Sequence, residues 1–357
     1  MSKRLYVALA LCCFLVAGLF TGRAVEGATA DTLETGPGQE AIAKAFAEIS
    51  LPKGDKNLLM LTNAGYGQMD LKTTEAFLDI AREVTGCSTG TRSLLNVHSS
   101  INDPLWCALF RKDTGKLVFV KWTEQGFVRQ MIDARPEKIL IPEGWKAAAA
   151  GPIGPHIFSV VSTSLTWAVN PPWPLLLSAN FHDHFCPGVN AGYVAAEYYR
   201  ERMPLRQGEQ YVFQTAPALC PADALQAIFN TTAGKSSGYV MRIDPALLAR
   251  YEKEKVQPMT VVMRVNRKAD TCDGAVIGFD WNRAYADTGV KADEISPPGG
   301  QANPMFWISR TKMSRELVKL PKEKLLSYIV ELKRFSGNAR LADKITGGDP
   351  YGIVWNE

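Results

Sequence analysis

Two of the chain's four histidines and a cysteine lie within five positions of the segment FHDHFCPG, residues 181–188. His182, His184 and Cys186 alternate along the chain, so an extended backbone would direct all three side chains to the same side. Imidazole and thiolate are the ligands that zinc and other first-row transition metals favour in proteins. The segment therefore predicts a metal site, although a disulfide or a plain buried turn would also explain it.

A second cysteine occurs in a similar context. Cys186 and Cys220 each precede a proline and a stretch that is typical of a helix. At the start of a helix the unpaired backbone N–H groups and the helix dipole favour thiolate over thiol. We therefore expect Cys220 to be a further metal ligand. Asp223 follows three positions later and is a candidate proton acceptor in metal-assisted chemistry, but a helix-capping acid is an equally good interpretation.

The cysteine count leaves a redox alternative open. Five cysteines follow residue 30, so at least one stands outside any intrachain disulfide. In an oxidising compartment two nearby cysteines form a disulfide by default. A thiol-redox protein that uses Cys186 and Cys220 is therefore one hypothesis, and the pairing of the remaining cysteines is open: Cys87, Cys107 and Cys272.

The first thirty residues have the layout of a secretory signal. Lys3 and Arg4 precede an uncharged apolar run over residues 5–20, and small residues at 28–30 offer a cleavage site. The run is short for a membrane span. We expect residues 1–30 to be a signal peptide and the protein to be exported, either periplasmic or extracellular. An uncleaved anchor is the alternative.

Composition narrows the class of protein. After residue 30 the chain keeps 37 basic and 35 acidic residues, a balance that gives no reason to expect nucleic acid or an anionic membrane surface as a partner. A hydrophobic share of 46% and a charged share of 21% are those of an ordinary globular protein. The remaining length suffices for two domains of usual size.

The elements that would position these residues mix helices and strands. In the first half we expect helices over residues 36–49 and 73–84 and a strand over 116–122. Residues 143–158 are rich in Gly, Ala and Pro, and we place a domain boundary there. In the second half we expect helices after Cys186 and from Pro221, paired strands over 259–266 and 274–281, and a helix over 321–335 with Leu325, Ile329 and Leu332 inward.

Strict alternation of strand and helix is absent, which favours the α+β class. The sequence thus predicts two lobes, residues 31–150 and 151–357, each with a mixed sheet packed against helices. The second lobe would hold the metal and carry a C-terminal helix.

Two motifs resemble those of the FmdE family, which is named after a formylmethanofuran dehydrogenase: His182-x-His184-x-Cys186-Pro187-Gly188-x-x-x-Gly192 and Cys220-x-x-Asp223-Ala224-Leu225-Gln226. The resemblance covers roughly residues 165–280. It implies a small α+β domain that pairs as a dimer and holds a zinc-like ion near the His/Cys motif. The family name reflects an operon that encodes a molybdenum or tungsten enzyme, so it implies no formylmethanofuran activity here.

The sequence departs from the family downstream of the second motif. The family tends to read Gly-Cys-Thr-x-Gly, whereas residues 230–234 read NTTAG and lack the cysteine. A matching TGCSTG occurs in the first half, at residues 85–90. Aligning Gly90 with Gly234 places Asp79 on Asp223 without a gap. We therefore expect a degenerate internal repeat, a monomer that acts as a pseudo-dimer, and a two-fold relation that carries Cys87 towards His184. A disulfide between Cys87 and Cys107 is the alternative.

These observations predict an exported protein that binds one transition metal ion, with zinc as the first choice. Metal-assisted chemistry on a small molecule is one function, and non-catalytic binding of a metal or a metal-bearing cofactor is another. Four protein ligands would close the site, while three ligands and a water would leave it open for chemistry. The sequence leaves both the enzymatic status and the oligomeric state open.

Overall fold

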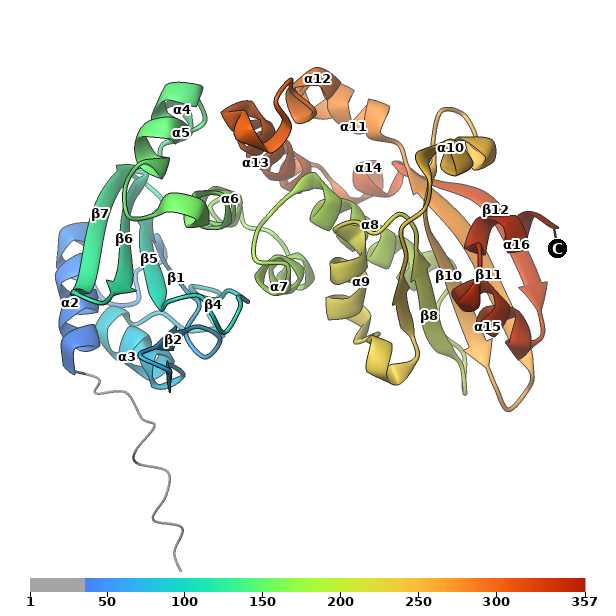
Figure 1. Cartoon of the computed structure of the whole chain (residues 1–357), viewed down its shortest axis with the longest axis horizontal. Helices are drawn as coiled ribbons and strands as arrows, with labels where there is room; N and C mark the ends of the chain where they lie inside the picture. The colour runs from blue at the N-terminus through green and yellow to red at the C-terminus, as the bar shows by residue number, and fades with distance from the viewer. Residues whose placement is uncertain (1–35, 357) are drawn as a thin grey trace, which may run out of the picture.

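The computed structural model describes residues 36–356, which form two lobes (Figure 1). Each lobe contains a five-stranded mixed sheet packed against helices, so the predicted α+β class with two lobes is confirmed. The predicted signal peptide lies outside the described residues. Within them no helix combines the length and the apolar character needed to cross a membrane.

The first lobe is built around a sheet with the order β4-β1-β5-β6-β7. Strand β4 runs parallel to β1, and the other neighbours are antiparallel. The elements of this lobe are α2 (Gly36–Ile49), β1 (Leu58–Thr62), β2 (Gln68–Met69), β3 (Lys72–Thr73), α3 (Ala76–Thr85), β4 (Leu94–Asn96), β5 (Trp106–Arg111), β6 (Lys116–Thr123) and β7 (Gly126–Asp133). The helix expected over 36–49 and the strand expected over 116–122 are confirmed. Helix α3 ends where expected, because Gly86 adopts the left-handed conformation at its C-cap.

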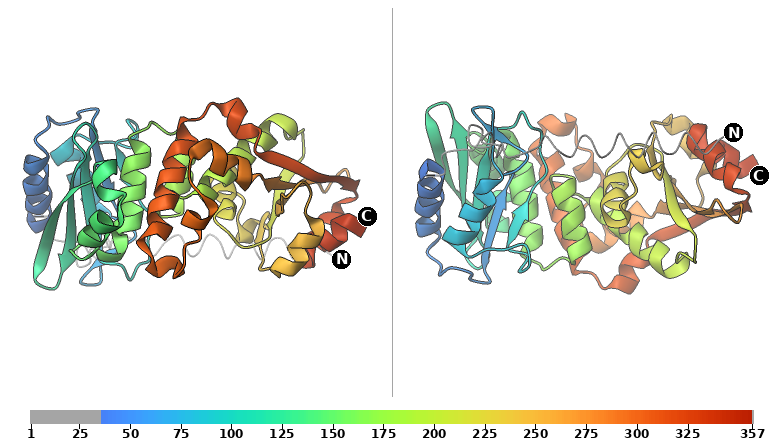
Figure 2. Two further views of the ribbon diagram at one scale, coloured as in Figure 1. Left: turned by 90° about the horizontal axis from the view of Figure 1, so that it is seen from above. Right: turned by 90° about the horizontal axis from the view of Figure 1, so that it is seen from below.

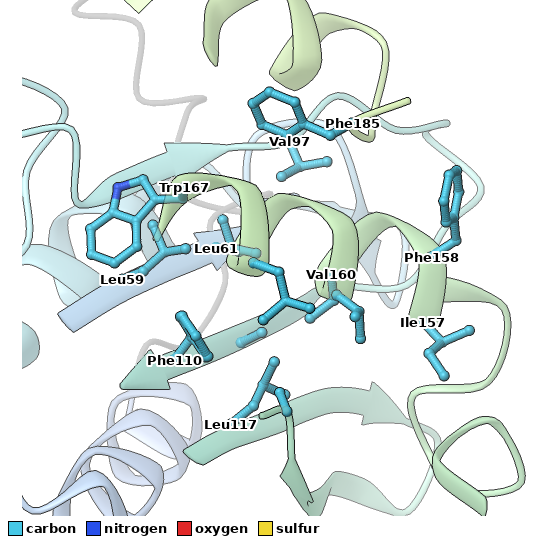
Figure 3. Close-up of a cluster of buried hydrophobic side chains, with 14 of the residues drawn as sticks. Leu59, Leu61, Val97, Phe110, Leu117, Ile157, Phe158, Val160, Trp167 and Phe185 are labelled. Atoms are coloured by element: carbon cyan, nitrogen blue, oxygen red, sulfur yellow. The ribbon is translucent and has the colours of Figure 1, made fainter. Parts of the chain in front are cut away.

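Both faces of this sheet are covered. Helices α2 and α3 lie on the outer face, where Ile42, Ala45 and Ile49 of α2 are fully buried. The inner face is covered by helices that connect the lobes: α4 (Pro136–Ile139), α5 (Pro142–Ala149), η1 (Gly154–His156), α6 (Ile157–Trp167) and α7 (Trp173–Phe181). Figure 3 shows the apolar side chains of this inner core: Leu59, Leu61, Phe110 and Leu117 of the sheet, with Ile157, Val160 and Trp167 of α6.

The inner core continues into the second lobe. Phe185, Cys186 and Val189 belong to the same buried cluster as the sheet residues of the first lobe, as does Ala224. One side of the proposed metal site is therefore fixed by the core that joins the two lobes. The views along the perpendicular direction show the connecting helices between the two sheets (Figure 2).

The second sheet has the order β12-β11-β10-β8-β9. Its lobe contains α8 (Pro187–Arg202), β8 (Gln210–Thr215), α9 (Pro221–Phe229), η2 (Ala233–Lys235), β9 (Gly238–Val240), α10 (Pro245–Leu248), η3 (Ala249–Tyr251), β10 (Pro258–Asn266), β11 (Thr271–Phe279), α11 (Trp281–Thr288), α12 (Ala292–Ile295), η4 (Gly300–Ala302), α13 (Pro304–Lys319), α14 (Lys322–Leu326), β12 (Ile329–Gly337), α15 (Ala339–Gly347) and α16 (Pro350–Asn356). The helices expected after Cys186 and from Pro221 are confirmed, as is the antiparallel pair β10–β11.

The prediction of a single helix over residues 321–335 is wrong. Helix α14 ends at Leu326, and residues 329–337 form β12, which pairs antiparallel with β11. Ile329 packs in the core on the α8 side of the sheet, whereas Leu332 packs on the α15 side. A helix would place these two residues on one face, but in a strand an odd spacing separates them. Pairing with the open edge of β11 overrides the helical periodicity of the sequence.

The two lobes share one topology. Leaving aside the short pair β2–β3 of the first lobe and the helices inserted between strands of the second, the elements of each lobe run helix, strand, helix and then four strands, and the first two strands of each five-stranded sheet are its parallel pair. The register also corresponds, because Thr62 of β1 and Thr215 of β8 each pair with the last residue of their parallel neighbour.

The sequence offset agrees with this topology. Helices α3 and α9 both end at a left-handed residue, Gly86 and Asn230, and these lie as far apart in sequence as Gly90 and Gly234 do. Strands β4 and β9 show the same separation. This correspondence supports the proposal of an internal repeat.

The lobes are not arranged like a symmetric dimer. Helices α2 and α3 lie on the outside of the first lobe, whereas α8 and α9 lie between the second sheet and the first lobe (Figure 1). A two-fold rotation would place both helix pairs at the interface or both outside. Instead, the helix pair lies on the side of the sheet that faces away from the second lobe in the first lobe, and on the side that faces the first lobe in the second lobe.

Cys87 lies in the outer core of the first lobe, beneath α2 and α3, and does not approach His184. The composite site expected from Cys87 is therefore wrong. The alternative disulfide is not formed either, because all five cysteines of the described chain are free. The second lobe supplies the predicted metal ligands alone.

Candidate metal centre

The histidine–cysteine segment forms a turn between two helices. His182 is the C-cap residue of α7 and has helical dihedral angles, and Asp183 adopts a left-handed conformation with φ of 70°. Cys186 is the extended N-cap residue of α8. Because the backbone is not extended, the expected alignment of His182, His184 and Cys186 on one side is wrong.

The fold brings three of the four predicted ligands together. One ligand atom each from His182, Cys186 and Cys220 lies within 4.8 Å of the other two. This is the only such group of His, Cys, Asp or Glu side chains within residues 36–356. Donors around one zinc ion lie roughly 3.5–4 Å apart, since Zn–S and Zn–N bonds measure about 2.3 and 2.0 Å. The group could therefore hold a metal ion after small side-chain movements.

Two glycines allow the cysteines to approach each other. A Cβ atom on Gly188 would lie 2.8 Å from Cβ of Cys220, and one on Gly192 would lie 2.6 Å from Cβ of Ala224. Both distances are shorter than an ordinary contact between carbon atoms. The glycines, one helical turn apart on α8, thus permit the close packing of α8 on α9 that sets Cys186 beside Cys220.

His182 has the orientation typical of a metal ligand. Its Nδ1 lies 2.6 Å from Oδ2 of Asp223, so Nδ1–H donates to the carboxylate, and loss of the Nε2 proton would free a lone pair for a metal. Nε2 is buried and has no hydrogen-bond partner. Metal-binding histidines commonly use one nitrogen for the metal and donate the other N–H to a carboxylate. Asp223 therefore orients His182, and its role as a proton acceptor stays a prediction.

The two cysteines share one proton. The pKa of Cys220 is lowered to about 4, because its sulfur accepts a hydrogen bond from Cys186 and lies beside His182, while burial opposes the shift. The same hydrogen bond, together with burial, raises the pKa of Cys186 well above its usual value. Burial disfavours the charged form of His182, but Asp223 and the nearby Cys220 outweigh it and raise its pKa to about 10. A bound metal would displace these protons.

His184 lies next to this group without joining it. Its ring centroid is 4.3 Å from that of His182 and 4.6 Å from that of Phe158, and its Nδ1 hydrogen-bonds with the carboxylate of Asp183. The side chain also lines a separate cavity of about 730 Å³ between the lobes, together with His98 and His156.

A cavity of about 440 Å³ borders the two cysteines. Besides Cys186 and Cys220, its wall includes an arginine and several large apolar or aromatic side chains that sequence reasoning did not select: Met259, Phe279, Trp281, Tyr285, Arg310 and Met313. These come from β10, β11, α11 and α13, which are distant in sequence from the ligand motif. No local pattern marks them, because only the folded second lobe gathers them at one place.

Comparison with known proteins finds a family model that covers the segment containing the site. Residues 181–327 match the model of a family described as "FmdE, Molybdenum formylmethanofuran dehydrogenase operon". The second lobe, from the histidine–cysteine segment through α14, thus resembles the FmdE family, and the expected resemblance is confirmed. The matched segment contains His182, Cys186 and Cys220. No curated protein matches the chain.

The contact between Asp223 and His182 gives a testable expectation. Replacing Asp223 by asparagine should weaken metal binding by roughly 10- to 100-fold, because a neutral amide accepts the Nδ1–H hydrogen bond more weakly and does not raise the basicity of the ring. A chelator competition titration would measure the affinity. Asp79→Asn is the matched control, since Asp79 occupies the corresponding position of α3 and is exposed. Equal affinities of Asp223→Asn and the unaltered protein would contradict the assigned role.

Proposed function

We propose that this protein binds one transition metal ion, with zinc as the first choice, through Nε2 of His182 and the sulfurs of Cys186 and Cys220. The observation that carries the proposal is the close group of donors: a ring nitrogen of His182 and the sulfurs of Cys186 and Cys220 lie within 4.8 Å of one another, and Asp223 holds the Nδ1 side of the ring. An imidazole and two thiolates are a donor set that zinc favours over the oxygen-preferring cations.

The site supports metal-assisted chemistry on a small molecule better than a purely structural role. Three protein donors leave a coordination position free, and the cavity beside Cys186 and Cys220 offers access to it. A metal bound there would act as a Lewis acid or lower the pKa of a coordinated water. Asp223 keeps His182 oriented, so a substrate proton would go to another group or to solvent. A non-catalytic role in capturing a metal or a metal-bearing cofactor requires the same ligands.

The proposed place of action is outside the cytoplasm, after removal of residues 1–30. It rests on the sequence layout of that segment alone. The near balance of charges supports a small-molecule partner over nucleic acid or a membrane surface.

A thiol-redox function is the second candidate. It is favoured by the hydrogen bond between the Cys186 and Cys220 sulfurs and by the low pKa of Cys220. In this function the two thiols would form a disulfide on oxidation, with two electrons and two protons passed to a disulfide or quinone acceptor.

Metal analysis combined with thiol titration separates the two candidates. The purified full chain is expected to retain about one equivalent of metal, and addition of a chelator should make two further thiols reactive. The physical reason is that a coordinated thiolate is protected until the metal leaves. A metal-free protein in which Cys186 and Cys220 are joined by a disulfide would contradict metal binding and favour the redox function.

A further inference from the structure

Arg310 of α13 is a partly buried cation in the wall of the cavity beside the metal group. It forms no ion pair with any carboxylate of residues 36–356. Its Nη1 donates to the carbonyl oxygens of Ile295 and Phe306, and its guanidinium lies 3.4 Å from the centroid of the Phe306 ring. These contacts fix the group and leave Nε and Nη2 without a protein acceptor in the described chain.

The position of Arg310 relates it to the metal ligands. Burial lowers the pKa of Arg310, while the negative charges of Cys186, Cys220 and Tyr285 act in the opposite direction. Arg310, Cys186 and Cys220 line the same cavity, so the guanidinium and the two sulfurs border one space.

The charge balance of the cavity is incomplete once the metal is counted. A divalent ion, two thiolates and a neutral imidazole sum to zero formal charge, so a loaded site does not neutralise Arg310. Glu252 and Lys255 are exposed at the rim and offset each other. A partly buried cation without a partner is costly, and an anionic ligand would remove that cost.

Apart from Gln257 and Asn282, the remaining wall is largely apolar and aromatic. Phe279 and Trp281 lie with ring centroids 4.5 Å apart, and Tyr285 continues this surface. The cavity volume of about 440 Å³ falls within the roughly 300–1,000 Å³ range of small-molecule sites. A single cation matches one negative charge, and the planar fork of a guanidinium matches the geometry of a carboxylate.

We propose that this cavity binds a small monocarboxylate with an apolar or aromatic body, whose carboxylate pairs with Arg310 and whose body packs on Phe279, Trp281 and Tyr285. This inference rests on the proposed metal function, because the metal cancels the charge of the cysteines. The bound monocarboxylate would lie beside Cys186 and Cys220, which hold the metal. The cavity therefore determines which class of substrate reaches the metal site. Phosphate fits less well, since its higher charge calls for more than one cation.

The test uses benzoate as the probe and the metal-loaded full chain as the protein. Isothermal titration calorimetry and intrinsic tryptophan fluorescence would report binding. Benzoate is expected to bind, whereas benzamide and inorganic phosphate bind at least roughly tenfold more weakly. Arg310→Gln should weaken benzoate binding by about 10- to 100-fold, the size of a charge-assisted hydrogen bond, and Arg310→Lys by less. Arg340→Gln is the matched control, because Arg340 is exposed on α15, on the far face of the second sheet.

The outcomes separate this inference from the metal proposal. Metal content is measured in every variant and should stay constant. Suppose that the protein retains its metal, but Arg310→Gln and the unaltered protein bind benzoate equally well, or neither binds it. Either result would overturn the monocarboxylate site and leave the metal function standing. A protein without metal would refute the metal function. If that metal-free protein still bound benzoate in a way that depends on Arg310, the monocarboxylate site would be supported. If it did not bind benzoate, both the metal function and the monocarboxylate site would be overturned.

Discussion

Replacing Cys220 by serine is expected to remove most of the bound metal and leave the fold intact. The serine hydroxyl stays protonated at neutral pH and is a poor ligand for zinc, so the site loses one of its three donors. The loss of metal affinity should be larger than the roughly 10- to 100-fold loss expected when a residue that hydrogen-bonds to a metal ligand, such as Asp223, is replaced. Cys220 is only partly buried, so the substitution disturbs packing less than a change at Cys186 would. Metal analysis after dialysis, with circular dichroism to follow the fold, would measure the effect.

Cys186→Ser should give the same metal loss, together with a lower stability because the Cys186 side chain is buried in the core that joins the lobes. Cys272→Ser is the matched control. Cys272 is also buried, but it packs on the α15 side of the second sheet. It should therefore lower the unfolding free energy and leave metal content unchanged. Full metal occupancy in either Cys186→Ser or Cys220→Ser would refute the proposed ligand set.

Replacing Gly192 by valine is expected to destabilise the second lobe and weaken metal binding at the same time. A Cβ atom at this position would lie 2.7 Å from the carbonyl oxygen of Pro221, so α8 and α9 must move apart. Overpacking of this kind costs about 1–3 kcal/mol of unfolding free energy, and the backbone contact favours the upper end. The gain in helix propensity over glycine is less than about 1 kcal/mol and does not compensate. Because Cys186 and Cys220 start these two helices, their separation also disrupts the ligand geometry.

Chemical denaturation and chelator competition would measure the two effects of Gly192→Val. Gly234→Val is the control, since no atom lies within 4 Å of a Cβ placed there and the residue has no left-handed backbone. Unchanged stability and affinity in Gly192→Val would show that close helix packing does not position the cysteines.

Several local features were predictable from the sequence because short-range interactions decide them. A proline directly after Cys186 and another after Cys220 mark the first turns of α8 and α9, since proline needs no N–H partner there. The left-handed C-cap requires a residue such as Gly86, which ended α3 as expected. The apolar runs of β10 and β11 indicated a buried strand pair, and donor types alone indicated a candidate metal site.

Other features depended on segments that are distant in sequence. Ile329 and Leu332 have helical spacing, yet the open edge of β11 recruits them into β12. The mutual placement of the lobes could not be predicted either, because the same topology permits both a two-fold pair and the observed arrangement. For this reason Cys87 was expected near His184 and instead lies in the outer core.

For the site itself, the sequence alone determined which side chains could bind a metal and that Cys186 and Cys220 begin helices. Only the tertiary structure decided that His182 joins them while His184 lines the other cavity, and that Asp223 holds Nδ1 of His182. It also decided that Arg310 lines the cavity beside the cysteines. The reason is physical. Residue type and local backbone preference act over a few positions, whereas a binding site is a set of distances between elements, and those distances are fixed by packing such as that of Gly188 and Gly192 against α9.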